Sequence, residues 1–525
     1  MKMLFISIDL VMGTRVLVNV LKAKDFKAHS LEINRMRYLD TFSEKAMDNI
    51  YRFSAGYDVV GLSFNSFNSV IAAQLGKYFK SRGVKWLITG GHHATAAPEE
   101  VIPYSDIVAI YEAELTLPKL LAHLKEGRPL DEVPGIIFKD KKGKIVNTGC
   151  PTIENNLDNI PFQSCSPEDI TYYDFKTDKF DKPAFDSLFP HGGTNYFIMA
   201  SRGCPFRCTY CSTNLLRKLN KDFMKIRKRS VPNVISEMEA AKQLGFKGFY
   251  ICDDNFLAYT MEEIEEFVKL YRQKLGLPFG IIGLNPNNMR AANSAKKIDI
   301  LLDSGLSDVR IGIQSGSNKT LKMFKRSYNA EELPGLLSAF KDRKTIWKSP
   351  HDKLRIVVDF ICDSAWEDEK DKIDTLKTAN DLLPIYGIQF NTLIYLPGTD
   401  VYEMALEKGW LKDKEKDIYL RGIVGIEDNI YNRLLYLIAV LKERGSRLPD
   451  EVLSHILEAH KKDPGLAEKL IDFMIKTVND IEGHHGFNTT YLTLHPYLKG
   501  FSKWTKTAGQ KGKKVLFRSY HEVYG

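Results

Sequence analysis

Three cysteines within eight residues constrain this chain of 525 residues more than any other feature. Cys204, Cys208 and Cys211 have the spacing CxxxCxxC, so one short loop can fold three thiolates around a single inorganic centre. Soft thiolate ligands prefer iron–sulfur clusters, zinc or copper(I). A cubane cluster normally takes four cysteines, and this loop supplies three. The spacing therefore indicates an iron that is left open to a ligand other than a side chain.

A structural zinc site is the alternative interpretation of the loop. Such a site uses pairs of Cys or of Cys and His, typically spaced CxxC, and a fourth ligand. His191 is the only nearby residue of a suitable type, and it precedes Gly192, Gly193 and a predicted strand, as a loop residue would. The spacing therefore favours a cluster over zinc.

The loop resembles in detail the signature of the radical S-adenosylmethionine enzymes. Gly203 precedes the first cysteine, Pro205 follows it, and the aromatic residue Tyr210 precedes the last cysteine. The resemblance implies that the three cysteines hold a [4Fe–4S] cluster, whose open iron takes the amino and carboxylate groups of S-adenosylmethionine. It also makes Tyr210 a candidate for binding this cofactor.

The composition is typical of a globular protein from a reducing compartment. Hydrophobic residues make up 44% of the chain and charged residues 27%, and no apolar run reaches the roughly 18 residues of a membrane helix. The first nine residues are better interpreted as a buried strand than as a signal peptide. The cysteines are odd in number and scattered outside the loop, which argues against a disulfide framework. We therefore expect a cytoplasmic protein with no transmembrane segment.

The net charge of +8 gathers partly at the C-terminal end, where seven basic residues stand against Glu522. A charge run of this kind is most often a solvated tail, and an anionic substrate or a membrane surface is the less favoured interpretation. No nucleic-acid recognition motif is present, so nucleic acid is not an expected partner. The basic residues are Lys499, Lys503, Lys506, Lys511, Lys513, Lys514 and Arg518.

Residues 1–125 alternate between apolar runs of strand length and helical stretches. This pattern predicts an α/β domain with a doubly wound, Rossmann-like parallel sheet. Ligands of such sheets bind beyond the carboxyl ends of the strands. The expected strands are Met3–Ile8, His29–Ile33, Asp58–Phe64, Trp86–Thr89 and Ile107–Ile110, and the expected helices lie near Arg15–Lys22, Val70–Ser81 and Thr116–Leu124.

The expected strand ends carry small residues that expose the backbone to a ligand. In their order along the chain, these segments resemble a cobalamin-binding domain of the form that is fused to radical enzymes. Two residues depart from that family: Val11 stands where the motif DxHxxG has its histidine, and Tyr111 stands where glycine is common. The resemblance therefore implies cobalamin without a histidine below the cobalt. The residues that it places at cobalamin are Met12, Gly13, Ser63, Phe64, Gly90, Gly91, His92 and Glu112.

Adjacent histidines at 92 and 93 suggest a metal site at first sight. Neighbouring residues at a strand end point to opposite sides, so hydrogen bonding within the loop is the better interpretation for both.

Residues 126–194 are expected to be a linker, because prolines recur in them and a hairpin is predicted at Gly135–Val146. Residues 195–402 then repeat βα units, which predicts a barrel or a large part of one. The resemblance specifies a partial TIM-type barrel of six units, (β/α)6, with the cysteine loop at its C-terminal mouth. The expected strands are Tyr196–Ala200, Gly248–Cys252, Phe279–Leu284, Asp308–Ile313, Leu354–Cys362 and Ile388–Tyr395, and the expected helices are Val231–Leu244, Met261–Lys274, Ala295–Ser304, Ala330–Lys341 and Lys370–Leu383.

Three polar residues at the ends of these strands are candidates for contact with S-adenosylmethionine. Asp253 follows the second strand, where an N-cap of the next helix is the simpler interpretation, and the resemblance places it near the methionine part of the cofactor. Gln314 and Ser315 follow the fourth strand in a stretch close to the family's pattern. The turn that begins at Pro397 is expected to shape the pocket.

Residues 403–525 are expected to form a helical C-terminal domain with a basic tail, which covers the barrel mouth and contributes substrate contacts. Helical periodicity is clear in Asn429–Arg444, Glu451–His460 and Leu466–Ile481.

The resemblance as a whole implies a cobalamin-dependent radical S-adenosylmethionine C-methyltransferase. Such an enzyme transfers a methyl group from methylcobalamin to an unactivated carbon by means of a 5′-deoxyadenosyl radical, and it needs an electron donor such as flavodoxin or ferredoxin. The two cofactor sites would then face each other with the substrate between them. No catalytic acid or base is predicted, because radical hydrogen abstraction needs none. The substrate class stays open between a small molecule, a lipid and a peptide.

Two other functions remain open from the sequence. The same cofactors could serve ring formation, rearrangement or oxidation without methyl transfer. A cobalamin-binding regulatory protein with a structural cluster is the second alternative, and reductive cleavage of S-adenosylmethionine would exclude it.

Overall fold

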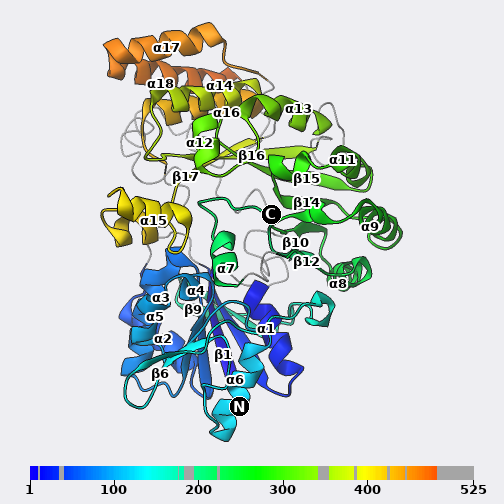
Figure 1. The fold of residues 1–525 in the computed structure, drawn as a ribbon, viewed down its shortest axis with the longest axis vertical. Helices are drawn as coiled ribbons and strands as arrows, with labels where there is room; N and C mark the ends of the chain where they lie inside the picture. Colours follow the sequence, from blue (N-terminus) through cyan, green and yellow to red (C-terminus); the bar gives the residue numbers. More distant parts are fainter. Residues whose placement is uncertain are drawn as a thin grey trace. The chain divides into compact units, whose positions relative to one another are not determined.

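The computed structural model describes residues 1–9, 12–34, 41–175, 177–182, 194–220, 225–340, 354–382, 387–421, 426–443 and 446–481. The chain divides into two compact units (Figure 1). The first comprises Met1–Pro190, Gly203–Ser230 and Ile394–Gly422, and the second comprises His191–Arg202, Val231–Leu393 and Ile423–Gly525. The cysteine loop therefore belongs to the first unit, although Asn195–Ile198 before it and Gly248–Ile251 after it are strands of the second unit.

The first unit is built on a nine-stranded sheet with the order β7-β6-β5-β4-β3-β1-β2-β8-β9. Its six central strands, from β5 to β8, run parallel, whereas β6, β7 and β9 pair antiparallel at the two ends. The doubly wound sheet predicted from the alternating pattern is confirmed. The strands are β1 (Lys2–Ile8), β2 (Lys27–Asn34), β3 (Val59–Ser63), β4 (Leu87–Gly90), β5 (Ile107–Ala109), β6 (Ile136–Lys139), β7 (Ile145–Asn147), β8 (Ile170–Asp174) and β9 (Lys179–Asp181).

Helices cover both faces of this sheet (Figure 1). Because successive side chains of a strand point to opposite faces, Leu4 and Ile6 of β1 pack with one set of helices and Met3 and Phe5 with the other. The first set contains α2 (Glu44–Phe53), α3 (Ser69–Ser81) and α5 (Pro98–Val101), and the second contains α1 (Met12–Lys22) and α6 (Thr116–Glu126).

The stretch expected as a linker, 126–194, contributes β6, β7, β8 and β9 to the ends of this sheet. The predicted hairpin is present: β6 and β7 pair antiparallel across a turn in which the amides of Lys142 and Lys144 donate to Asp140 Oδ1 at 2.8 and 2.9 Å. Gly143 in that turn has φ +79°, in the left-handed region that favours glycine.

The second unit is built on a six-stranded sheet whose neighbours all run parallel and follow the order of the sequence. This is the βα repeat predicted for a partial barrel, and Figure 1 shows α8, α9 and α11 on the outside of the strands. The strands are β10 (Asn195–Ile198), β13 (Gly248–Ile251), β14 (Phe279–Leu284), β15 (Leu306–Gln314), β16 (Arg355–Cys362) and β17 (Gly387–Thr392). The helices that follow them include α8 (Val231–Gln243), α9 (Met261–Lys274), α11 (Ser294–Leu302) and α14 (Glu369–Asp381).

One predicted helix of this unit, Ala330–Lys341, is broken. Its described part is η7 (Ala330–Glu332), α13 (Leu333–Leu337) and η8 (Ser338–Phe340). Pro334 and Gly335 explain the break, because proline is tolerated only in the first turn of a helix and glycine weakens a helix interior.

The predicted helical C-terminal region is confirmed as α16 (Ile430–Glu443), α17 (Asp450–Lys462) and α18 (Pro464–Ile481). Asn380 of α14 fastens this region to the barrel helices, since its amide donates to the carbonyl of Leu448 at 2.7 Å and accepts from the amide of the same residue at 2.9 Å. The basic tail beyond residue 481 lies outside the described residues.

Candidate active site

The cysteine loop lies between β11 (Ser201–Arg202) and α7 (Thr213–Leu219). Cys208 is buried, and Cys204 and Cys211 are partly exposed. The amide of Cys211 donates to the carbonyl of Cys208 at 3.1 Å, which fixes the last two cysteines in one turn. Gly203 has φ +98°, a conformation that glycine adopts without strain. The local sequence thus directs the chain into a tight turn just before the first thiol.

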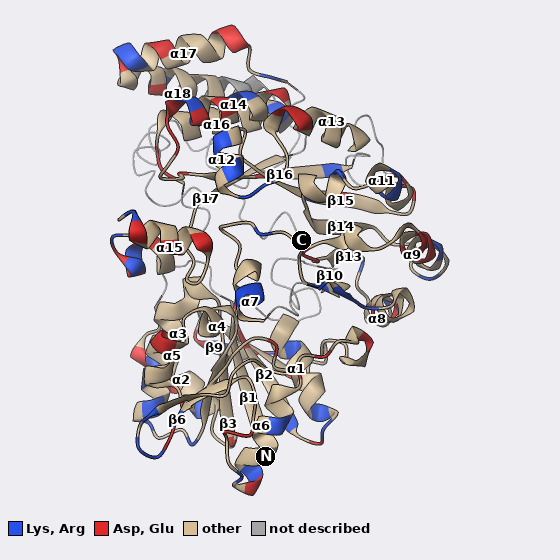
Figure 2. Cartoon of the chain, in the orientation of Figure 1, with Lys and Arg blue, Asp and Glu red and all other residues tan. Residues whose placement is uncertain are grey.

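The turn at 397–402 packs on this loop. The amide of Val401 donates to the carbonyl of Thr209 at 3.1 Å, and Lys218 of α7 pairs with Asp400 at 2.5 Å. Figure 2 shows the basic residues of α7 in blue. Gly398 has φ +79°, and a Cβ atom there would lie 2.7 Å from the side chain of Leu215. The cysteine loop is therefore held from outside by a segment almost 200 residues further along the chain.

The three thiolates of the loop are donors that an iron–sulfur cluster takes. In a cubane each cysteine binds a different iron, whereas zinc needs its ligands around one point. In the described part of the chain, no three His, Cys, Asp or Glu side chains converge as ligands of one metal ion. His191, the residue considered as a zinc ligand, lies outside the described residues.

The carboxyl edge of the N-terminal sheet brings together most of the residues predicted to bind cobalamin. Ser63 and Gly90 are paired in register on β3 and β4. A Cβ atom at Gly91 would meet the backbone of Phe64 at 2.7 Å, so this glycine serves the packing of two strand ends. Gly13 lies at the start of α1, beside the half-buried Met12. No atom lies within 4 Å of the position that a Cβ atom would take at Gly13. The open backbone that suits a bulky ligand is therefore at Gly13 rather than at Gly91.

Glu112 follows β5 at the same edge and pairs with a residue that the sequence analysis missed. Arg227 Nη1 donates to Glu112 Oε2 at 3.0 Å and to the carbonyl of Glu154 at 2.7 Å, and Nη2 also donates to the Glu112 carboxylate. Arg227 is 7% exposed and lies on β12 (Arg227–Lys228), in the segment after the cysteine loop. The predicted cobalamin contact at Glu112 is thus also a contact between the sheet edge and this segment.

The two histidines at 92 and 93 differ in burial. His92 is exposed, whereas His93 is 1% exposed and its Nδ1 lies 3.1 Å from Ser66 Oγ. Burial lowers the pKa of His93 to about 4, so the ring is neutral at pH 7. The hydrogen-bonding role expected for this pair is found at His93.

In the second unit, Asp253 braces the strand that leads into the cysteine loop. Its carboxylate accepts from the amide of Ala200 and from Ser201 Oγ, both at 2.6 Å. Burial raises its pKa to about 7, although these hydrogen bonds oppose the shift. The N-cap interpretation is wrong, because the next helical turn, η6 (Phe256–Ala258), has Asn255 at its N-cap.

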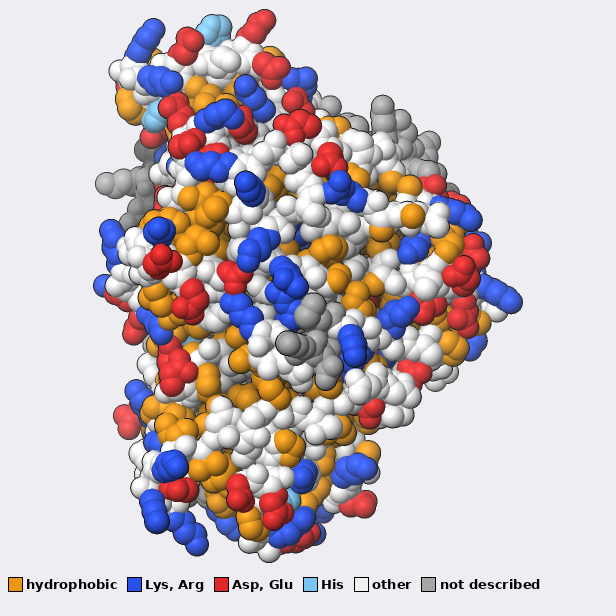
Figure 3. Space-filling view, in the orientation of Figure 1, with side chains coloured by type: hydrophobic (Ala, Val, Ile, Leu, Met, Phe, Trp, Pro, Cys, Tyr) orange, Lys and Arg blue, Asp and Glu red, His pale blue; other side chains and the backbone are white. Residues whose placement is uncertain are grey.

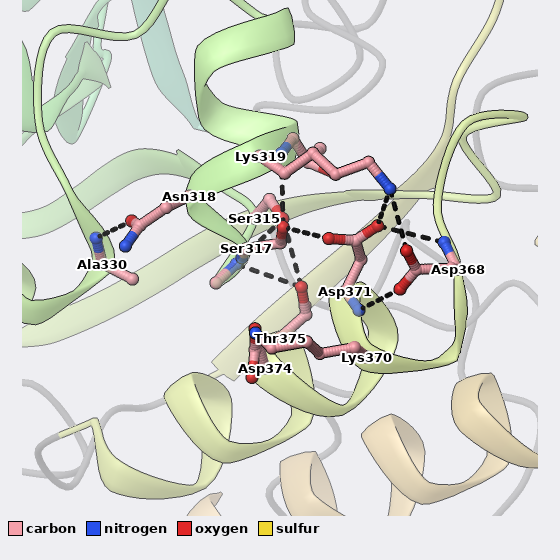
Figure 4. A network of polar contacts seen from close by, with 12 residues as sticks. Ser315, Ser317, Asn318, Lys319, Ala330, Asp368, Lys370, Asp371, Asp374 and Thr375 are labelled. Carbon is pink, nitrogen blue, oxygen red and sulfur yellow. Dashed lines mark hydrogen bonds and ion pairs between the residues drawn. The ribbon is translucent and has the colours of Figure 1, made fainter.

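Gln314 and Ser315 lie at the carboxyl end of β15, and Figure 4 shows Ser315 in a polar network. Gln314 has φ +76°, which is uncommon for a residue with a side chain and often marks a functional site. Ser315 Oγ lies 3.1 Å from Thr375 Oγ1 and accepts from the amide of Ser317 at 3.0 Å. The partner on α14 was missed because it lies 60 residues further along the chain.

A second missed cluster lies on the face of β15 and β16 opposite the buried side chains. Val309 and Ile311 are fully buried, whereas Arg310 between them is 22% exposed. Arg310 Nε and Nη2 donate to the two Asp359 oxygens at 2.9 and 2.8 Å, and Nη2 also contacts Gln389. This face of the sheet is therefore polar and carries paired charges.

The model of the radical SAM superfamily matches residues 198–345, which include the cysteine loop, β13, β14 and β15. This chain is a radical S-adenosylmethionine enzyme. The matched domain implies a [4Fe–4S] cluster and S-adenosylmethionine.

Two curated relatives of this radical enzyme are methyltransferases. The chain is 24% identical over 409 residues to cytidylyl-2-hydroxyethylphosphonate methyltransferase from Streptomyces wedmorensis. The aligned region covers 71% of this chain and 71% of the relative. It is 24% identical over 416 residues to bacteriochlorophyllide d C-8(2)-methyltransferase from Chlorobaculum tepidum, covering 77% of this chain and 80% of the relative.

Solved structures match the fold of both units. The methyltransferase TsrM from Kitasatospora setae, with cobalamin and a [4Fe–4S] cluster bound, has a TM-score of 0.62 at 13% identity, covering 92% of this chain and 100% of TsrM. The cobalamin-dependent radical enzyme OxsB, with aqua-cobalamin and S-adenosylmethionine bound, has a TM-score of 0.60 at 15% identity, covering 100% of this chain and 83% of OxsB. The radical enzyme described here therefore has the domain architecture of the cobalamin-dependent members.

None of the helices in the described ranges combines the length and the apolar character that a membrane span requires.

Proposed function

We propose that this enzyme is a cobalamin-dependent C-methyltransferase that acts on an unactivated carbon. The observation that carries the proposal is that the cysteine loop and the carboxyl edge of the N-terminal sheet belong to one compact unit. The pair Arg227–Glu112 and the contact of Val401 with Thr209 hold the loop and its flanking segments within that unit. A cluster at the loop and a cobalamin at the edge would thus be held by the same part of the fold.

Each part of the chain has a defined task in this proposal. When bound, the cluster with S-adenosylmethionine supplies hydrogen abstraction, and cobalamin supplies the methyl group. The loop thiols at Cys204, Cys208 and Cys211 hold three irons, and the open backbone at Gly13 admits a bulky ligand. Four residues are proposed to lie around S-adenosylmethionine and either to contact it directly or to fix the backbone that does. They are Gln314, Ser315, Asp253 and Tyr210.

For the substrate we propose a polar small molecule. The relatives act on compounds as different as a cytidylyl phosphonate and a bacteriochlorophyllide, so they do not single out one class. The paired charges of Arg310 and Asp359 on the sheet face favour a polar ligand over a lipid tail, because burying such groups against hydrocarbon is costly.

The remaining partners are proposed on chemical grounds. A flavodoxin or ferredoxin in the cytoplasm would supply single electrons to the cluster, and all seven cysteines are thiols, as expected in a reducing compartment. Nucleic acid is not proposed as a partner, because the sequence contains no recognition motif for it, although Lys and Arg side chains gather near the middle of the face seen in Figure 3.

A second candidate uses the same cofactors without methyl transfer. The match to OxsB, a cobalamin-dependent radical enzyme, covers the whole chain, so this candidate is supported by the same fold.

An anaerobic assay of the reconstituted, cobalamin-loaded protein separates these functions. With S-adenosylmethionine and a strong reductant, wild type should release 5′-deoxyadenosine and S-adenosylhomocysteine. Cys208→Ala should lose the bound iron and all 5′-deoxyadenosine, whereas the control Cys150→Ala, at an exposed thiol, should retain both products. If 5′-deoxyadenosine formed alone, the non-methylating function would replace the proposal.

A further inference from the structure

A segment in the first unit, residues 397–421, contacts both proposed cofactor regions, and we name it the strap. Its first part contains α15 (Asp400–Glu407). This part holds the cysteine loop through the amide of Val401, which donates to the carbonyl of Thr209 between the second and third cysteines at 3.1 Å. Any displacement of α15 would therefore be transmitted to the backbone of the loop.

The second part of the strap reaches the carboxyl edge of the N-terminal sheet. It contains a π-helical turn, η9 (Glu415–Tyr419), which contacts α3 and the turn after β3. Glu100 on α5 accepts from Lys414 Nζ at 2.6 Å and from the Tyr419 hydroxyl at 2.7 Å. π-Helical turns are rare and occur often at functional sites.

The two parts of the strap are joined by a contact within it. Lys414 Nζ lies 5.5 Å from the ring centroid of Tyr402 on α15, and this tyrosine is buried. Tyr402 is the neighbour of Val401, which holds the cysteine loop. A continuous chain of contacts thus runs from Glu100 through Lys414 and α15 to the cysteine loop.

The hydrogen bonds of Glu100 with Lys414 and Tyr419, which we name the anchor, stay intact near pH 7 because of the charges of these groups. Burial opposes the charge of Glu100, but the hydrogen bonds from Lys414 and Tyr419 outweigh it and lower the pKa of the carboxyl. Burial likewise opposes the charge of Lys414, and the bond to Glu100 still raises the pKa of the ammonium. His93, whose Nε2 lies 3.6 Å from Glu100, is neutral and does not compete with Lys414 as a cation.

We propose that the strap sets the separation between the cysteine loop and the carboxyl edge of the N-terminal sheet, with Glu100 as its positioning residue. This inference rests on the proposed function. Cleavage of S-adenosylmethionine requires the cluster on the loop and the residues proposed around that cofactor, but not the edge of the N-terminal sheet, so it should not depend on the anchor. Methyl transfer from S-adenosylmethionine to cobalamin requires the cysteine loop and the sheet edge at the correct distance from each other. A misplacement of about 1 Å can lower the rate by a factor of about 100.

The test uses the full chain and two matched pairs of variants. Glu100→Gln removes the charge of the anchor, and Glu99→Gln is its control because the neighbouring side chain is exposed. Lys414→Met removes the cation, and Lys416→Met is its control because that lysine, on the same turn, is 79% exposed. Tyr419→Phe, which removes one hydroxyl, replaces Glu100→Gln if that variant does not unfold cooperatively.

Three measurements are made on each variant. The first is 5′-deoxyadenosine from S-adenosylmethionine and dithionite, and the second is S-adenosylhomocysteine formed with reduced cobalamin. The third is amide hydrogen exchange of residues 203–220 in protein without cobalamin, which reports the position of the loop independently of catalysis.

The expected result is a selective loss. Glu100→Gln and Lys414→Met should form S-adenosylhomocysteine about 10-fold more slowly or worse, with 5′-deoxyadenosine unchanged and faster exchange in residues 203–220. The inference would be overturned if wild type formed both products and the anchor variants kept both rates, or lost both equally. Failure of wild type to form S-adenosylhomocysteine would instead count against the proposed function.

Discussion

The carboxyl edge of the first sheet and the end of β13 in the second unit are held by different kinds of contact. In the first unit, Glu32, Glu100 and Glu112 each accept from a cation. In the second unit, Asp253 accepts from neutral donors, a backbone amide and a hydroxyl. The cations of the first unit are Arg15, Lys414 and Arg227.

The contacts also differ in how far apart their partners lie in sequence. Lys414 is 314 residues from Glu100, and Arg227 is 115 residues from Glu112. Asp253 and the backbone it holds at Ala200 are 53 residues apart, across neighbouring strands. Arg15 and Glu32 are 17 residues apart, so two of the three charged pairs of the first unit join distant segments, whereas Asp253 joins neighbouring strands of the βα repeat.

Removing a buried cation should break the first edge most severely. Arg15 Nε and Nη2 each lie 2.7 Å from Glu32, and both side chains are buried. Arg15→Met should lower the free energy of unfolding by about 3–5 kcal/mol, because it leaves Glu32 buried and uncompensated. Urea unfolding measures this loss of free energy. The double variant Arg15→Met/Glu32→Leu should regain most of the lost stability. Lys22→Met, the control, breaks a half-exposed pair with Asp169 and should lower the free energy of unfolding by about 0–1 kcal/mol. An equal loss for Arg15→Met and Lys22→Met would show that the buried cation does not hold this edge.

Asp253 accepts from neutral donors, so its contribution to the free energy of unfolding should depend on pH rather than on a charged partner. Burial raises the pKa of Asp253 to about 7, so its contribution to stability is full below about pH 4, the unfolded pKa, and is lost as the pH rises through about 7. Asp253→Asn has no such titration. Between about pH 5 and 8 the stability of wild type should therefore fall by about 2–3 kcal/mol relative to this variant.

Chemical denaturation at several pH values checks this prediction. Asp254→Asn, at the exposed neighbouring position, is the matched control and should follow wild type. A stability difference between wild type and Asp253→Asn that stayed constant with pH would show that the carboxyl does not change its charge in this range.

The smallest effect is expected in the network behind Ser315 (Figure 4). Asp371 accepts from Ser317 Oγ and Lys319 Nζ, both at 2.7 Å, and is buried. Asp371→Asn should lower the free energy of unfolding by about 1–2 kcal/mol through the weakened hydrogen bonds. Lys370→Met removes only an exposed pair with Asp374 on the same helix and should leave stability unchanged in the same denaturation experiment. If both variants behaved alike, the network would not brace the end of β15.

Much of the fold was predictable from periodicity. The runs Gly248–Cys252 and Phe279–Leu284 were predicted as strands and are found as β13 and β14, because buried parallel strands are continuous apolar runs between helices. The broken helix at 330–340 was missed because its apolar spacing outweighed Pro334 and Gly335 in the prediction.

The candidate site was predictable only in part. The thiols of the cysteine loop and the positions of Asp253, Gln314 and Ser315 at strand ends follow from motifs and strand boundaries. Arg227 and Lys414 could not be found in this way, because each is one basic residue among many in a polar stretch. Nothing local distinguishes a cation that will pair with a buried carboxylate from one that will face solvent.

The sequence by itself determined the cysteine loop and the two alternating α/β sheets, because thiol spacing and hydrophobic period are set by neighbouring residues. Only the tertiary structure decided that the loop belongs with the N-terminal sheet, and that Asp253 is a brace under the loop rather than a helix cap. Contacts such as Lys414 with Glu100 depend on chain segments hundreds of residues apart, and their energy appears only when folding brings these segments together.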